Sequence, residues 1–174
     1  MRYLKDGTER VVQFATRPAD FNAITITATT GEWTVADDHS GGIVKPLNIT
    51  ASDSNRFTFN TIDTAGNGER AGRSNAAGTV RIVREYAAGD TKQIDPAADT
   101  AFIAFGTKDT EVLLGIYRGP KLDGVALAAG DEYEYYEFTT DVPKVVEETD
   151  QYICYDVALI FSGTMTNGPK VLVA

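Results

Sequence analysis

Apolar and polar side chains alternate with a period of two in several segments of this chain. Ile24, Ile26 and Ala28 alternate with threonines, and the same pattern recurs at 56–60 and 79–82. Successive side chains of a strand point to opposite faces, so this alternation predicts half-buried strands of antiparallel sheets. None of the clear segments has a helical period.

Longer segments extend the pattern. The continuous apolar runs 101–105 and 112–117 predict a central hairpin covered on both faces. The segment 151–161 predicts the longest strand, and 170–173 a short closing strand. Between Asp131 and Phe138 the aromatic residues change phase, which predicts a β-bulge.

Turn residues are frequent and candidate helices are few. The 16 glycines of the chain supply turns between the predicted strands. We therefore predict an all-β fold, an antiparallel sandwich, jelly roll or barrel of about ten short strands, in a single domain covering residues 1–174. The predicted core consists of Ile24, Ile26, Phe57, Phe59, Val80, Ile82, Phe102, Phe105, Leu113, Ile116, Ile153, Tyr155, Val157 and Leu159.

One stretch, residues 63–78, departs from the strand pattern. It contains no large apolar side chain and is longer than most connections, as functional or disordered loops are. Two interpretations stay open: a flexible loop, and a contact arm ordered by a partner. The candidate contact residues are its polar and basic side chains: Asn67, Arg70, Arg73 and Asn75.

The charge of the chain limits its partners. The net charge is −9, which argues against nucleic acid and anionic membranes as partners because phosphates would be repelled. Residues 91–174 carry 6 basic and 14 acidic side chains, a net of −8, with Arg118 as their one arginine. This asymmetry is either drift across one globule or a pair of complementary surfaces for neighbouring copies.

No targeting or membrane-spanning segment is predicted. The amino terminus lacks the apolar region of a secretory signal, and no window approaches the length of a membrane span. The single cysteine, Cys154, excludes an internal disulfide and a multi-cysteine zinc site. We expect synthesis in a reducing cytoplasm.

No catalytic, metal-binding or cofactor-binding set emerges. His39, the only histidine, lies among acidic and glycine residues and is predicted to be an exposed turn residue, and Cys154 is predicted to be a buried small side chain. Glu132, Glu134 and Glu137 lie beside tyrosines, as glycosidase acids do, but alternation places the first two on the solvent face of a strand.

Two local sequence patterns are typical of binding sites. Trp33 and the tyrosines at 133, 135 and 136 either belong to the core or form a platform for stacking sugars. Residues 63–68 begin like a calcium loop, but Ala65 and Ser74 occupy two of the ligand positions, which argues against calcium.

Several features together resemble the small virion structural proteins of tailed bacteriophages. They are the Thr- and Gly-rich strands, turns such as 87–90 and 128–131, the single cysteine and the absence of a catalytic set. The resemblance is to capsid decoration (cement) proteins and, less closely, to tail-tube or neck components. It implies a non-enzymatic homo-oligomer in the virion that contacts the major capsid protein or another virion protein. The alternatives are a carbohydrate-binding or receptor-binding β domain and a hydrolase that uses scattered carboxylates.

Overall fold

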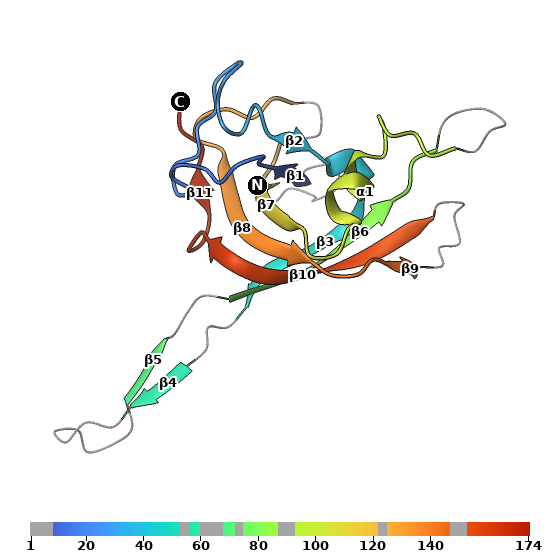
Figure 1. Ribbon diagram of the computed structural model, residues 1–174. Coiled ribbons are helices and arrows are strands. Elements are labelled where there is room, and N and C mark those ends of the chain that lie inside the picture. Colours follow the sequence, from blue (N-terminus) through green and yellow to red (C-terminus); the bar gives the residue numbers. More distant parts are fainter. Residues whose placement is uncertain are drawn as a thin grey trace.

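The computed structural model describes residues 9–52, 56–59, 68–71, 75–86, 93–121, 125–146 and 153–174. Strands far exceed helix in these residues, which confirms the all-β prediction (Figure 1). The elements are β1 (Glu9–Gln13), β2 (Asp37–Asp38), η1 (Ser40–Gly42), β3 (Ile43–Ser52), β4 (Arg56–Phe59), β5 (Gly68–Ala71), β6 (Asn75–Val83), α1 (Thr100–Phe105), β7 (Glu111–Arg118), β8 (Glu132–Thr140), β9 (Lys144–Val146), β10 (Cys154–Met165) and β11 (Lys170–Val171).

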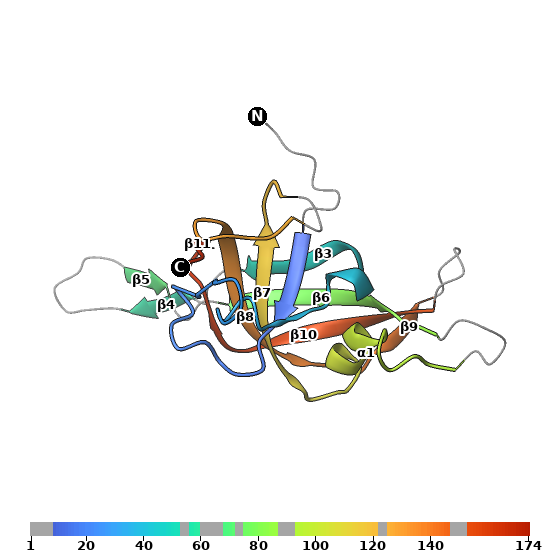
Figure 2. The same cartoon turned by 90° about the horizontal axis from the view of Figure 1, so that it is seen from above.

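Most strands belong to one antiparallel sheet of nine strands. Its order is β2-β1-β7-β8-β10-β6-β3, with β11 paired to β8 and β9 paired to β10. The sheet curls so that β1, β7 and β8 run across β10, β6 and β3 (Figure 2). Strands β4 and β5 form a separate two-stranded sheet.

Arg118 links strands from both ends of the curled sheet. Its Nη1 donates to the Glu134 carboxylate on β8, and its Nη2 donates to the backbone carbonyl of Ile49 on β3. Its Nε lies 3.6 Å from Oε1 of Glu9 on β1. The one arginine of the acidic second half therefore holds β1, β3, β7 and β8 together.

The strands β7 and β8 have a core on each face. One core, between the crossing halves of the sheet, includes Leu114, Tyr136 and Phe138. The other includes Tyr133 and Tyr135, and is covered by residues that precede β2 and by Leu172 near the C-terminus. Both faces of β8 are thus buried, as expected for the central strands.

This arrangement corrects the predicted bulge at Asp131–Phe138. The register of β7 and β8 runs without a shift from the pair Glu111 and Thr139 to the pair Ile116 and Glu134. The aromatic residues change phase because each face of β8 packs in a different core. The described bulge in this part of the sheet lies in β10, where the register against β8 shifts between Phe161 and Met165.

The run 101–105 is a helix, so its prediction as a strand was wrong. A run of five apolar residues does not distinguish a strand from a helical turn, and here Ala101 and Phe105, four residues apart, are the fully buried members. The buried carboxylate of Asp99 accepts the Glu85 backbone N–H and pairs with Arg84 at 3.0 Å. These contacts attach the start of α1 to the chain that follows β6.

The prediction of a strand at 24–29 was also wrong, because this segment forms one isolated bridge, between Thr25 and Val173. The Glu32 side chain accepts the Thr25 backbone N–H, and the Thr25 hydroxyl accepts the Glu32 backbone N–H. The Thr25 N–H thus bonds to a side chain, and the strand-like backbone bonds of this segment are those of Ile24 and Ile26 with Val173. Ile24 is nevertheless fully buried.

The core prediction holds for most of its members. Ile153 is the error, since it precedes β10 and is 46% exposed. Phe57 and Phe59 lie in β4, where the side chains fall outside the described part of the structure. Those buried are Ile24, Val80, Ile82, Phe105, Leu113, Ile116, Val157 and Leu159, and those partly buried are Ile26, Phe102 and Tyr155.

Candidate assembly surfaces

The strands β4 and β5 form a hairpin, called the arm below, that projects away from the rest of the protein (Figures 1 and 2). It continues outward from β3 and β6, which are paired as far as Ser52 and Asn75. Arg56 pairs with Ala71 in the arm, and Phe57 pairs with Arg70. Because β4 and β5 pair with each other and with no other strand in the described residues, the arm is a thin extension and not a part of the main sheet.

The structure describes two of the four predicted contact residues, Arg70 and Asn75. Arg70 lies in β5, and Asn75 is the exposed first residue of β6, where its side chain accepts the backbone N–H of Ala76. Asn67 and Arg73 lie outside the described residues. Within the predicted loop at 63–78, residues 68–71 and 75–78 are strand.

His39 is buried and not an exposed turn residue, which corrects the sequence prediction. Its Nε2 atom lies 3.1 Å from Oε1 of Gln13. Its ring packs edge-on against that of Phe105 of α1, with 5.6 Å between the ring centroids. The Nδ1 atom is buried with no hydrogen-bond partner among the described residues. Burial lowers the pKa of His39, while Asp37 and Asp38 act in the opposite direction.

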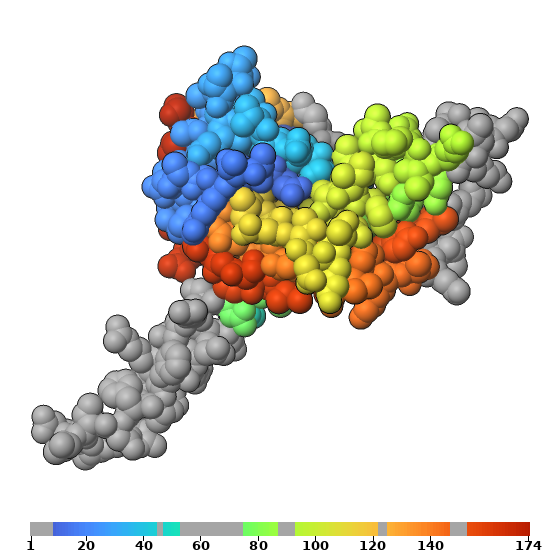
Figure 3. All heavy atoms as spheres, viewed as in Figure 1, coloured from blue at the N-terminus to red at the C-terminus, as the bar shows by residue number. Residues whose placement is uncertain are grey.

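A hollow of about 440 Å³ lies between β2 and α1, beside His39. Asp37 and Asp38 line one side, and Ile103 of α1, which is 62% exposed, lines the other. Gln13 and Thr110 complete its polar part. The segments that contain β2 and α1 meet on the face shown in Figure 3. The charged residues of this hollow are all acidic.

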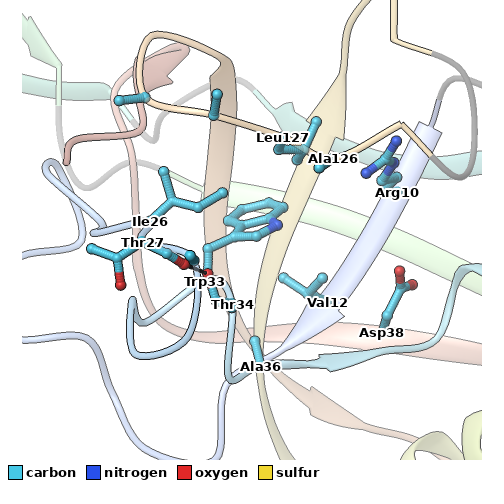
Figure 4. A pocket seen from close by; sticks show the side chains of 13 residues that line it. Arg10, Val12, Ile26, Thr27, Trp33, Thr34, Ala36, Asp38, Ala126 and Leu127 are labelled. Carbon is cyan, nitrogen blue, oxygen red and sulfur yellow. Dashed lines mark hydrogen bonds between the residues drawn. The ribbon is translucent and has the colours of Figure 1, made fainter.

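A second hollow, of about 450 Å³, lies beside Trp33 (Figure 4). Arg10 and Asp38 lie on one side of it, so its charges are balanced, and Val12 and Leu127 contribute apolar surface. Trp33 itself is only 6% exposed.

The aromatic cluster around Trp33 belongs to the core. Trp33 packs against Tyr133 at 5.8 Å and against Phe14 at 6.1 Å between ring centroids. Tyr133, Tyr135 and their neighbour at 136 are all buried. The flat ring faces needed for stacking a sugar are therefore covered by other side chains.

Glu137 forms a closed polar network, which alternation did not predict. Its Oε1 accepts the Tyr135 hydroxyl at 3.0 Å and pairs with Arg17 Nε at 2.9 Å. Its Oε2 accepts the backbone N–H of Thr164, within the bulged part of β10, at 2.8 Å. Burial and the nearby carboxylate raise the pKa of Tyr135. Both carboxylate oxygens thus bind groups at the junction of β8 and β10.

The other two glutamates do not form a catalytic pair with room for a substrate. Glu132 and Glu134 line a hollow of only about 70 Å³, where Glu134 is bound to Arg118. Ligand pockets usually measure about 300–1,000 Å³. The part of the chain that the structure describes contains no group of three potential metal ligands, and it has no helix long and apolar enough to cross a membrane.

Comparison with known protein families decides between the virion components. The whole chain, residues 1–174, matches the family described as phage tail tube protein. The chain belongs to this family. No curated protein sequence matches it.

Membership of the tail tube family corrects the main functional prediction. The protein is a structural protein of the phage virion that interacts with other virion proteins, as expected, but the match supports the tail-tube alternative and not capsid decoration. The sequence offered general virion features but no motif that separates these two classes.

Proposed function

We propose that this protein is the repeated, non-enzymatic subunit of a phage tail tube. The observation that carries the proposal is the match to the tail tube family along the full chain. A tube built from copies of one subunit needs contacts between different surfaces of neighbouring copies, because such contacts propagate into rings or helices. The protein should therefore carry at least two distinct surfaces for its own copies.

The arm supports this proposal. An isolated two-stranded hairpin is at best marginally stable in water, and β4 and β5 pair with no other strand in the described residues. Contacts with a neighbouring copy would supply the stabilisation that the arm lacks in the monomer. In this proposal Arg70, Arg73, Asn67 and Asn75 contact that neighbour.

The charge distribution supports contacts of the same kind. Copies with a net charge of −9 repel each other, so a close contact is favoured where basic side chains meet acidic ones. Residues 91–174 supply acidic side chains, and the arm region supplies three arginines among three acidic residues: Arg56, Arg70 and Arg73 beside Asp53, Asp63 and Glu69. Individual exposed ion pairs are weak, so the strength would come from their repetition along the assembly.

Immunogold electron microscopy of phage particles tests the location. Antibodies against this protein should label disrupted tails along their length and leave intact heads unlabelled. Labelling confined to heads would contradict the proposal and favour capsid decoration.

Assembly of the purified protein tests the role of the arm. The unaltered chain should form tubes visible by electron microscopy, and replacing Arg70 and Arg73 by Ala should weaken assembly and make it less dependent on salt. The matched control replaces Lys108 and Lys170 by Ala, which removes the same charge elsewhere. Equal effects of both double substitutions would argue against a specific arm contact.

A further inference from the structure

The turn that joins β10 to β11 contains an asparagine followed by a glycine, Asn167 and Gly168. Both residues are exposed, and the turn lies at the outside of the molecule (Figure 1). In any Asn-Gly pair the backbone nitrogen of the glycine can approach the side-chain amide of the asparagine, because glycine has no side chain to hinder it. Asparagine is also among the thermolabile residues of proteins. The turn is therefore a candidate site of spontaneous chemical change.

The local geometry leaves the nitrogen of Gly168 accessible. Gly168 has a φ of +77°, which favours glycine. Apart from its chain neighbours, no described atom lies within 4 Å of the position that a Cβ would take there. Its backbone N–H donates to the carbonyl of Thr166, two residues earlier, at 3.1 Å. This bond lies in an exposed turn and not in a strand ladder, so water can replace it.

Other exposed asparagines lack these features. Asn48 lies in β3 of the main sheet and is followed by the fully buried Ile49. Asn22 lies in an exposed turn, as Asn167 does, but it is followed by Ala23. The side chain of the following residue hinders the approach of the backbone nitrogen in both. A second Asn-Gly pair begins at Asn67, which lies outside the described residues.

We infer that Asn167 deamidates spontaneously in the folded protein. The backbone nitrogen of Gly168 loses its proton and attacks Cγ of Asn167. A bond forms between these two atoms, the bond from Cγ to the side-chain nitrogen breaks, and that nitrogen takes up a proton and leaves as ammonia. Water then opens the cyclic imide at one of its two carbonyls, which gives aspartate or isoaspartate. Water is the only other reactant, so the step needs no enzyme and no oxidant.

The change would alter both the charge and the main chain of the turn. Each event adds one negative charge to a chain whose net charge is −9. Isoaspartate also lengthens the main chain by one carbon, directly before the pairing of Lys170 with Tyr133 and the buried Leu172. A structural protein of the virion is not replaced after the particle is released, so altered copies would accumulate with time.

Mass spectrometry of the aged protein tests the inference. The purified protein is kept in warm, mildly alkaline buffer and digested at acidic pH, so that the reaction stops during preparation. The peptide that contains Asn167 should gain the mass difference between an amide and an acid. Its rate of conversion should exceed that of Asn22 and Asn48 in the same sample by about tenfold, because only Asn167 of the three precedes glycine. Equal rates at the three positions, or no conversion at Asn167, would overturn the inference.

Two variants test the proposed attack. Asn167→Gln should abolish conversion, because ring closure from a longer side chain is much slower. Gly168→Ala should slow conversion at Asn167 by about tenfold, since the added methyl hinders the nitrogen. The described structure has room for this methyl, and circular dichroism establishes whether the fold survives the positive φ. Unchanged conversion in folded Gly168→Ala protein would overturn the mechanism. If this variant does not fold, the comparison of Asn167 with Asn22 in the unaltered chain decides.

Discussion

The strand β8 and the arm strands β4 and β5 are all antiparallel, yet their surroundings differ completely. Strand β8 pairs with β7, β10 and β11 and has a core on each face. Within the part of the chain that the structure describes, the arm strands pair with each other and with no other strand. In the proposed tube, one chain thus combines a region stabilised by its own core with a region stabilised by a neighbouring copy.

The largest effect is expected in β8, the strand with a core on each face. Phe138 is fully buried and packs against Tyr136 at 5.7 Å and Phe161 at 6.1 Å between ring centroids. Phe138→Ala should lower the free energy of unfolding by about 3–5 kcal/mol, measured by urea denaturation. Ile160→Ala, at a position 55% exposed on β10, is the control and should have a small effect. Similar losses for both variants would contradict the assignment of the core.

The second-largest loss of stability is expected at the junction of β8 and β10. Glu137→Ala leaves the Tyr135 hydroxyl, the Thr164 backbone N–H and Arg17 without their carboxylate. We expect the free energy of unfolding to fall by about 2–3 kcal/mol, since hydrogen bonds to charged groups are lost in a buried site. Glu132→Ala, at the exposed start of the same strand, serves as the control. A change under about 0.5 kcal/mol at Glu137 would show that the network contributes little.

Acid should destabilise the protein through His39. Its pKa is lowered from 6.5 by burial, which outweighs the raising effects of Asp37 and Asp38, so the unfolded chain binds the proton more readily than the native protein. The associated stability is therefore present above about pH 6.5 and is lost as the pH falls toward the lowered native pKa, by at most about 1.4 kcal/mol per pH unit. The measurement is urea denaturation at pH 7 and pH 5.5.

The control for this titration is His39→Gln, which cannot gain a proton. Gln13 and Phe105 contact the ring, and neither titrates. The variant should lose most of the difference in stability between the two pH values. An unchanged difference would assign the pH dependence to carboxylates elsewhere.

The smallest effect on folding is expected in the arm. Arg70→Ala should change the free energy of unfolding of the monomer by less than about 0.5 kcal/mol, because β5 pairs with β4 and with no other described strand, and substitutions outside a core usually have small effects. The same change should impair tube assembly. A large loss of monomer stability would mean that the arm is part of the folding unit, and the contrast with β8 would fail.

The sequence by itself determined the all-β class, the central strand β7, the long strand β10 and eight of the buried core residues, because period-two alternation follows directly from strand geometry. It also singled out residues 63–78 for their lack of large apolar side chains, although Ala76 within them belongs to the core. It could not separate the helix α1 from a strand, because a run of five apolar residues is compatible with both.

Only the tertiary structure decided which faces of the strands were covered. The aromatic residues of β8 suggested a bulge, but the two cores explain their phase without one. His39 was predicted to be an exposed turn residue, but it is buried because α1 packs against it, and Glu137 is buried where the bulged part of β10 binds its carboxylate. The hollow beside Asp37 likewise joins β2 to α1, which lie more than 60 residues apart in the chain. Contacts between distant segments depend on how the sheet curls, and no local pattern encodes that curl.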